Sequence, residues 1–196
     1  MAEAHPVRLV VTDDLRRSRL TVLFRALLVI PHLVWLTLWS LPVTVAVPVN
    51  WVATVLLGRS PGWLHSFLAA YLIYNTHVNA YLHLVADPYP AFTSTQPYPV
   101  TVEIDGPARQ GRLGALLRWV LALPAWLFVE VLGYALWWLA VGGWFVALAL
   151  GRVPKGIRDL SAYCLRFRAQ TDAYSMLLTA RYPSLDLKPE TPDTQA

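Results

Sequence analysis

Charged residues are scarce in this chain of 196 residues. Asp, Glu, Lys and Arg make up 14% of it, against about 25% in a soluble globular domain. Hydrophobic residues account for 56%, nine residues are Trp, and the mean hydropathy is +0.45. A core of this size cannot bury so much apolar surface, so the composition excludes an ordinary soluble domain. We predict a membrane protein.

Cysteine and the motifs of catalysis are also nearly absent. The single cysteine, Cys164, excludes an internal disulfide and a cysteine-based metal cluster. The sequence has no glycine-rich phosphate loop and no nucleophile elbow. His65, His77 and His83 are poorly spaced for a metal site on one helical face. We therefore predict that the chain is not an enzyme and has neither a cofactor nor a metal site.

Basic residues are missing from two stretches, 26–58 and 119–151, each of 33 almost wholly apolar residues. Glu130 is the one acidic residue inside either stretch. A nucleic-acid-binding protein would instead mix Lys and Arg with exposed aromatic residues on a soluble fold, so we exclude nucleic acid as a partner. Several arginines precede the first apolar stretch, and no cleavage site follows a short apolar core. We expect this stretch to remain as a membrane anchor.

Each apolar stretch is too long for one perpendicular span of a bilayer. As a single helix it would measure about 50 Å at 1.5 Å per residue, whereas the hydrocarbon core is about 30 Å thick. We therefore predict a hairpin of two membrane-spanning helices in each stretch. The candidate tips are Leu41-Pro42 in the first stretch and Gly133 or Gly142-Gly143 in the second.

The sequence repeats itself at a constant shift of 93 residues. Arg, Pro, Gly and Trp residues stay in register between the copies, which chance similarity of apolar segments would not produce. The matched pairs include Arg16 and Arg109, Pro31 and Pro124, Trp51 and Trp144, Gly58-Arg59 and Gly151-Arg152, and Ala80-Tyr81 and Ala173-Tyr174. We define repeat 1 as residues 5–92 and repeat 2 as residues 98–185, and we predict a disordered tail at 186–196.

Each repeat is predicted to contain a strand, the membrane hairpin and an amphipathic helix. Apolar residues alternate in 6–12 and 99–105, which is typical of half-buried strands. Helical segments are expected at 63–85 and 156–180. The second of these carries several charges, such as Arg158, and each would cost about 2.5–3.5 kcal/mol at the centre of a bilayer. We therefore place both helices at the membrane interface.

Two spans per repeat would put both repeats the same way up. Every Lys and Arg would then lie on one face, which the positive-inside rule makes cytoplasmic, with both termini inside. Equivalent strands that meet at a twofold axis along the membrane normal must run antiparallel, and we expect Leu9 to lie opposite Val102, or one residue pair to either side of it. The predicted fold class is an all-α integral membrane protein built as a tandem parallel repeat. Each repeat has two transmembrane helices and one interfacial amphipathic helix, and the strands form a short cytoplasmic antiparallel β-ribbon.

Several short motifs carry a resemblance to a family. They are Tyr98-Pro99-Val100, Leu123-Pro124, Gly151-Arg152, Ala173-Tyr174 and Tyr182-Pro183 in repeat 2, and Ile30-Pro31-His32, Gly58-Arg59, Asn79-Ala80-Tyr81 and Tyr89-Pro90 in repeat 1. Over nearly its whole length the chain resembles two tandem copies of a bacterial and archaeal membrane family called domain of unknown function 4389. The resemblance implies a bacterial or archaeal cytoplasmic (inner) membrane, and it brings no reaction or ligand. Repeat 1 departs from the pattern at Asn75, where repeat 2 has Arg168.

Two kinds of residue are candidate functional sites. Glu130 is a carboxylate within an apolar stretch, and such residues are functional candidates by default. The alternative is that Glu130 lies near a hairpin tip and reaches the lipid headgroups. Clustered arginines are candidate contacts for anionic lipid, worth about 1 kcal/mol each near the surface. They are Arg16, Arg17, Arg19, Arg109, Arg112, Arg166 and Arg168.

These features predict a non-catalytic scaffold or accessory subunit of a membrane assembly. Its partners would be membrane lipids with anionic headgroups, together with further copies of the chain or a larger membrane complex. A small channel or transporter is the alternative, because tandem parallel repeats occur in transporters. The apolar stretches offer few polar residues for such a role.

Overall fold

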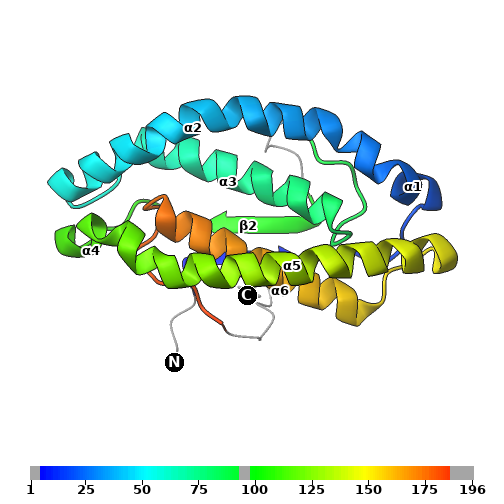
Figure 1. Cartoon of the computed structure of the whole chain (residues 1–196). Helices are drawn as coiled ribbons and strands as arrows, with labels where there is room; N and C mark the ends of the chain where they lie inside the picture. Colours follow the sequence, from blue (N-terminus) through cyan, green and yellow to red (C-terminus); the bar gives the residue numbers. More distant parts are fainter. Residues whose placement is uncertain (1–4, 93–97, 186–196) are drawn as a thin grey trace, which may run out of the picture.

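The computed structural model describes residues 5–92 and 98–185, and these contain six helices and two strands (Figure 1). The elements are β1 (Val7–Val11), α1 (Arg19–Leu28), α2 (Ile30–Leu57), α3 (Gly62–Leu82), β2 (Val100–Ile104), α4 (Arg112–Leu116), α5 (Arg118–Leu150) and α6 (Lys155–Ser175). Each repeat thus contributes a strand, a short helix, a long helix and a third helix in the same order. The predicted tail, 186–196, lies outside the described residues.

The two strands pair as an antiparallel ribbon, as the sequence predicts. Leu9 lies opposite Val102. Both side chains are buried, and they join one core cluster with Leu68 of α3 and Leu165 of α6. The alternation of apolar residues along the strands therefore reflects a ribbon with one covered face.

Each long apolar stretch forms one helix, so the predicted hairpins are wrong. α2 continues through Pro42 and Pro48, and α5 continues through Gly133 and Gly142-Gly143. Few polar residues flank the candidate tips, and the long apolar runs on either side of them favour one continuous helix. Inside an apolar helix proline and glycine are tolerated and bend the helix, and Figure 1 shows α2 as a shallow bow. Two helices, α1 with α2 and α5 alone, are long and apolar enough to cross a membrane.

The long helices α2 and α5 run in opposite directions (Figure 1), and α2 packs against α4 at one end while α5 packs against α1 at the other. Near one end, Trp51 stacks on Trp119 with ring centroids 5.5 Å apart, and its indole N–H donates to the Ala115 carbonyl at 2.9 Å. At the other end, the Trp144 indole donates to the Val22 carbonyl at 2.8 Å. These two hydrogen bonds are related by the shift of 93 residues, so each repeat makes the same contact with the other.

α3 and α6 lie inside the molecule, whereas the sequence analysis placed them as amphipathic helices at the membrane interface. Leu64, Leu68 and Leu72 of α3 are buried, as are Leu165 and Phe167 of α6. The two helices contact each other, α2 and β2 contact α3, and α5 and β1 contact α6. Their apolar spacing predicted one covered face, but both a long helix and a strand pack against each of them. The long helices thus form one outer layer, and the ribbon forms the other.

Glycines end both long helices. Gly58 and Gly151 have φ values of +71° and +67°, the left-handed conformation that glycine adopts at helix ends. The Gly58 N–H donates to the Thr54 carbonyl at 2.8 Å, and the Gly151 N–H donates to the Ala147 carbonyl at 2.8 Å. The chain then turns back so that α3 and α6 pack beneath the helices they follow.

Candidate functional site

The most extensive surface feature is a band of exposed apolar side chains on α1, α2, α4 and α5, which we call the apolar belt. Its members have between about one third and three quarters of their surface exposed. The most exposed include Leu20, Leu41, Val45, Leu113, Leu127 and Trp138. Monomeric soluble proteins rarely expose apolar patches of this extent, so the belt marks a surface that contacts lipid or another protein.

Only a narrow stripe of α2 is covered. Its buried residues are His32, Leu36, Val43, Asn50 and Thr54, which follow each other at intervals of four or seven residues and so share one helical face. Most of the remaining side chains are apolar, and many of them are exposed. A core helix of a soluble protein would be covered on most sides, and this exposure distinguishes α2 from such a helix.

Arginines gather at the two opposite ends of the belt. The backbones of Arg16 and Arg152 pair at the α1 end, and those of Arg59 and Arg109 pair at the α4 end. All four side chains are exposed. The predicted lipid contacts Arg16, Arg19, Arg109 and Arg112 are therefore surface residues that flank the belt.

Arg17 and Arg166 lie inside the protein, which contradicts their prediction as lipid contacts. They are 4% and 5% exposed. Arg17 pairs with Asp13 and donates to the Leu84 and Val85 carbonyls at 3.0 and 3.1 Å. The Arg166 guanidinium lies 5.4 Å from the centroid of the Tyr163 ring. Buried guanidinium groups of this kind are structural, because each must find partners inside the protein.

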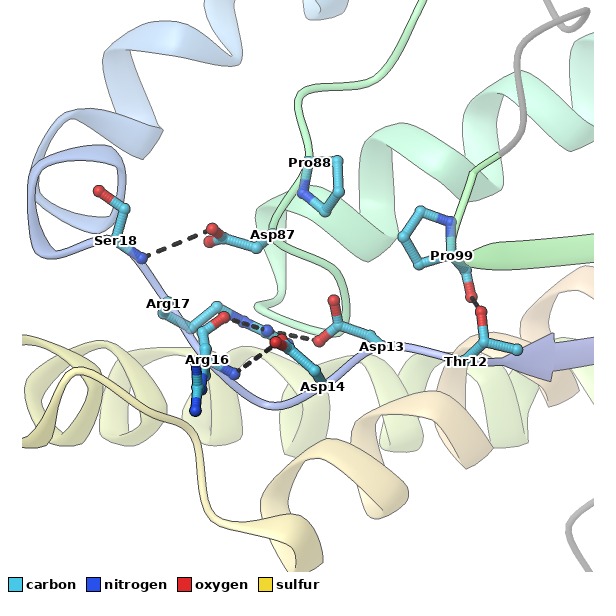
Figure 2. A pocket seen from close by; sticks show the side chains of 9 residues that line it. All are labelled: Thr12, Asp13, Asp14, Arg16, Arg17, Ser18, Asp87, Pro88 and Pro99. Carbon is cyan, nitrogen blue, oxygen red and sulfur yellow. Dashed lines mark hydrogen bonds and ion pairs between the residues drawn. The ribbon is translucent and has the colours of Figure 1, made fainter.

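A charged hollow of about 580 Å³ lies where the segment after β1 meets the loop after α3 (Figure 2). Its three carboxylates already have partners. Asp13 pairs with Arg17, Asp14 accepts the Arg16 backbone N–H at 3.1 Å, and Asp87 pairs with Arg25 at 2.8 Å. Among the described residues, no group of three His, Cys, Asp or Glu side chains could hold a metal ion. The hollow therefore ties two segments of repeat 1 together.

A second polar region lies along α5, and we call it the α5–α6 groove. It consists of two hollows of about 570 and 600 Å³ that share Glu130 and Arg168. The first is lined by Val47, Trp119, Trp126, Val129, Glu130, Arg168, Asp172, Ser175 and Met176. The second is lined by His83, Glu130, Gly133, Tyr134, Trp137, Trp138 and Arg168. Glu130 is exposed in the interior of α5, so no hairpin tip places it at the headgroups.

The carboxyl group of Asp172 has a shifted pKa in the groove. Burial raises the pKa of this carboxyl to about 6, and Arg168 partly offsets the effect because its Nε lies 4.0 Å from the Asp172 Oδ2. Burial also raises the pKa of the nearby Tyr71 hydroxyl on α3, with a further contribution from Asp172. Close by, the Trp126 indole donates to the Ser175 hydroxyl at 2.9 Å.

The sequence analysis singled out Glu130 and Arg168 but missed Asp172. The shift of 93 residues carries the signal, because Glu130, Arg168 and Asp172 correspond to Thr37, Asn75 and Asn79. In repeat 1 the Asn79 side-chain amide donates to the Asn75 Oδ1 at 3.0 Å. Three charged residues of repeat 2 thus replace three neutral polar residues of repeat 1, and the structure brings all three to one groove.

A buried arginine over a tyrosine ring occurs once in each repeat. The Arg25 guanidinium carbon lies 4.3 Å from the Tyr81 ring centroid, and that of Arg118 lies 4.0 Å from the Tyr174 centroid. Both pairs are related by the shift of 93 residues. Each joins the start of the long apolar segment to the end of α3 or α6.

Comparison with known families gives a match in both repeats. The family described as Domain of unknown function (DUF4389) matches residues 19–94 and 112–185. The chain belongs to this family. Each DUF4389 match begins with α1 or α4 and extends past α3 or α6, so the unit comprises the apolar helices, the core helix and its arginine–tyrosine pair. No curated protein and no solved structure matches the chain.

Proposed function

We propose that this DUF4389 protein is a non-catalytic membrane scaffold that lies within one leaflet of the bilayer. The apolar belt carries the proposal, because its exposed side chains on α1, α2, α4 and α5 need an apolar solvent. Burial of apolar surface contributes about 25 cal/mol per Å². Belt residues with half or more of their surface exposed, such as Leu41 and Leu127, therefore favour insertion into the acyl-chain region.

The ribbon argues against helices that cross the bilayer. β2 packs against α3 and β1 packs against α6, the core helices beneath α2 and α5. In Figure 1, β2 lies level with the middle part of α5 along the length of that helix. If α5 crossed the membrane, the ribbon would lie near the bilayer centre. A two-stranded ribbon has two open edges, and lipid-exposed sheet edges do not occur in the hydrocarbon region. The ribbon also exposes the Arg8–Glu103 ion pair, whose side chains are 31% and 52% exposed, and such charges are costly at that depth.

The length of α5 and the positions of the arginines favour long helices that lie parallel to the membrane surface. α5 has 33 residues and measures about 50 Å at 1.5 Å per residue, so a crossing helix would exceed a core of about 30 Å. Helices that lie parallel to the membrane surface have no such mismatch. Their two arginine-bearing ends then reach headgroups at the same depth, where each basic residue contributes about 1 kcal/mol with anionic lipid.

This orientation favours a scaffold over a channel, because helices confined to one leaflet leave no path across the bilayer. It also agrees with the absence of a free carboxylate in the hollow of Figure 2, where Asp13 and Asp87 are engaged by arginines. The ribbon layer would face the water and be available to further copies of the chain or to a larger membrane complex. We propose the cytoplasmic side for it, as the positive-inside rule predicts.

Sidedness at the two ends of the belt tests the proposal. Gly111 lies at the α4 end and Gly156 follows the end of α5, and a Cβ added at either meets nothing within 4 Å. Cysteines introduced singly at these positions should both react with a membrane-impermeant maleimide in inverted vesicles and not in intact cells. Cys164 is buried and gives a low background. Labelling of the two positions from opposite sides would show helices that cross the membrane.

A further inference from the structure

The α5–α6 groove places charges directly beside the apolar belt. Glu130 is exposed on α5, and its neighbours one turn away on the same face are the aromatic residues Trp126 and Tyr134. Glu130 forms no ion pair with any residue that the structure describes. A charge in this position next to acyl chains would be unfavourable without a partner.

Asp172 and Arg168 extend this polar region onto α6. Their 4.0 Å separation is at the limit of an ion pair, and the Arg168 side chain keeps 44% of its surface exposed. Burial also disfavours the charged form of Asp172. The groove thus offers two carboxylates and one guanidinium that each have capacity for a ligand. Two acidic groups and one basic group favour a ligand that carries both signs of charge over a simple anion.

We propose that the α5–α6 groove binds the headgroup of a zwitterionic aminophospholipid from the surrounding leaflet. The ammonium group lies against the carboxylates of Glu130 and Asp172, and the phosphate lies against the guanidinium of Arg168. The proposal rests on the proposed function, because the acyl chains of the lipid must continue along the apolar belt.

The groove walls fit such a ligand. Trp119 and Trp126 line one hollow, and Trp137 and Trp138 line the other. Aromatic rings attract alkylammonium groups through their faces, and tryptophan is the strongest of them. The walls also pack well against acyl chains. Each hollow, at about 570 and 600 Å³, is within the size range of small-molecule sites.

Repeat 1 supplies the substitutions for the test. Thr37, Asn75 and Asn79 occupy the equivalent positions, and the same fold accommodates them without charge. The triple variant Glu130→Thr/Arg168→Asn/Asp172→Asn therefore replaces the three charged residues by the neutral residues that the equivalent helices of repeat 1 already contain. The single variant Glu130→Gln, at an exposed position, removes one carboxylate should the triple variant fold poorly.

Native mass spectrometry of the full chain in mild detergent measures the binding. With equal amounts of phosphatidylethanolamine and phosphatidylglycerol, the wild type should retain one phosphatidylethanolamine, and the triple variant should bind it about tenfold more weakly. Glu130→Gln should weaken phosphatidylethanolamine binding by less than the triple variant does. A matched variant that replaces Arg16, Arg19, Arg109 and Arg112 by Gln should lose phosphatidylglycerol and keep phosphatidylethanolamine. Glycerophosphoethanolamine, which lacks acyl chains, should not compete.

Equal retention of phosphatidylethanolamine by the wild type and both groove variants would overturn the proposal. Equal displacement by phosphatidylglycerol or by glycerophosphoethanolamine would also overturn it. Flotation of the same variants with liposomes separates the two proposals. The triple variant should float like the wild type, because the belt is unchanged, and failure of the wild type to float would reject the membrane scaffold itself.

Discussion

Arg25 makes the strongest set of buried contacts that joins the apolar helices to the core, so its removal should be costly. The side chain is 2% exposed. It donates to the Tyr81 carbonyl at 2.6 Å, to the Ala86 carbonyl at 3.1 Å and to the Asp87 carboxylate at 2.8 Å. Arg118, its equivalent in repeat 2, donates to the Gln110 side chain. The two arginines therefore form a matched pair with different numbers of partners.

The expected magnitudes follow from those partners. Arg25→Gln leaves two buried carbonyls and the partly exposed Asp87 carboxylate short of a donor. At about 1.5–3 kcal/mol for each hydrogen bond from a charged donor, the two buried bonds alone are worth about 3–6 kcal/mol. Arg118→Gln leaves one neutral acceptor, and a hydrogen bond from a charged donor is worth about 1.5–3 kcal/mol. Both variants lose a comparable arginine–tyrosine contact. Arg25→Gln should therefore destabilise the protein by about 2 kcal/mol more than Arg118→Gln.

Thermal unfolding in mild detergent, followed by circular dichroism, measures the difference. In a chain of this size each kcal/mol lowers Tm by about 2–4 °C, so the Tm of Arg25→Gln should lie roughly 4–8 °C below that of Arg118→Gln. Equal losses would refute the reasoning, because they would show that the contacts of Arg25 with Asp87 and the two carbonyls contribute no more than the single contact of Arg118 with Gln110.

Three further predictions test individual features. The pKa of Asp172 is raised to about 6, so the folded state binds its proton more tightly and the stability falls as pH rises through about 6. Asp172→Asn should raise the stability at pH 8 by about 1–2 kcal/mol and remove this pH dependence. An unchanged pH profile of unfolding would contradict this prediction. Gly58→Ala should lower Tm, because φ is +71° at Gly58. Gly133→Ala should not lower it, because Gly133 lies inside a helix with open space around it. Equal Tm values for the two variants would show that the left-handed cap is absent. Cysteines at Leu9 and Val102, which lie opposite each other, should form a disulfide within one chain on oxidation, and crosslinks found only between chains on a denaturing gel would reject the ribbon.

The ribbon could be predicted in detail because symmetry constrained it. The shift of 93 residues makes 6–12 and 99–105 equivalent, and equivalent strands that meet at a twofold axis perpendicular to them must be antiparallel. That argument placed Leu9 opposite Val102 to within one residue pair, and the structure shows this pair. The prediction took the direction of its axis from two spans per repeat, yet the antiparallel ribbon is present although the hairpins are not.

The hairpins could not be judged from sequence, because proline and glycine act differently in apolar surroundings. Pro42 and Gly133 are turn signals in water, yet both lie inside continuous helices here. Helical periodicity likewise showed that α3 and α6 have an apolar face, but it could not show that a long helix would also pack against each of them. Nothing in the sequence around Arg17 indicated that its guanidinium group would donate to the backbone carbonyls of Leu84 and Val85.

The groove was partly visible in the sequence. Glu130 is the one acidic residue within an apolar stretch, and Arg168 differs from Asn75, its equivalent in repeat 1. Asp172 escaped notice because an acid on an amphipathic helix is ordinary. Only the fold shows that Glu130 on α5 shares one groove with Arg168 and Asp172 on α6.

The depth of α5 in the bilayer tests the central claim most directly. Leu123, Tyr134 and Phe145 are exposed, lie on one side of the helix and are spaced by eleven residues, or about 16 Å. Spin labels at these positions in liposomes should be accessible to oxygen and shielded from a water-soluble nickel chelate. A helix within one leaflet predicts the same depth for all three labels. A label at Tyr134 deeper by about 10 Å or more than the other two, with those two near opposite surfaces, would contradict the account.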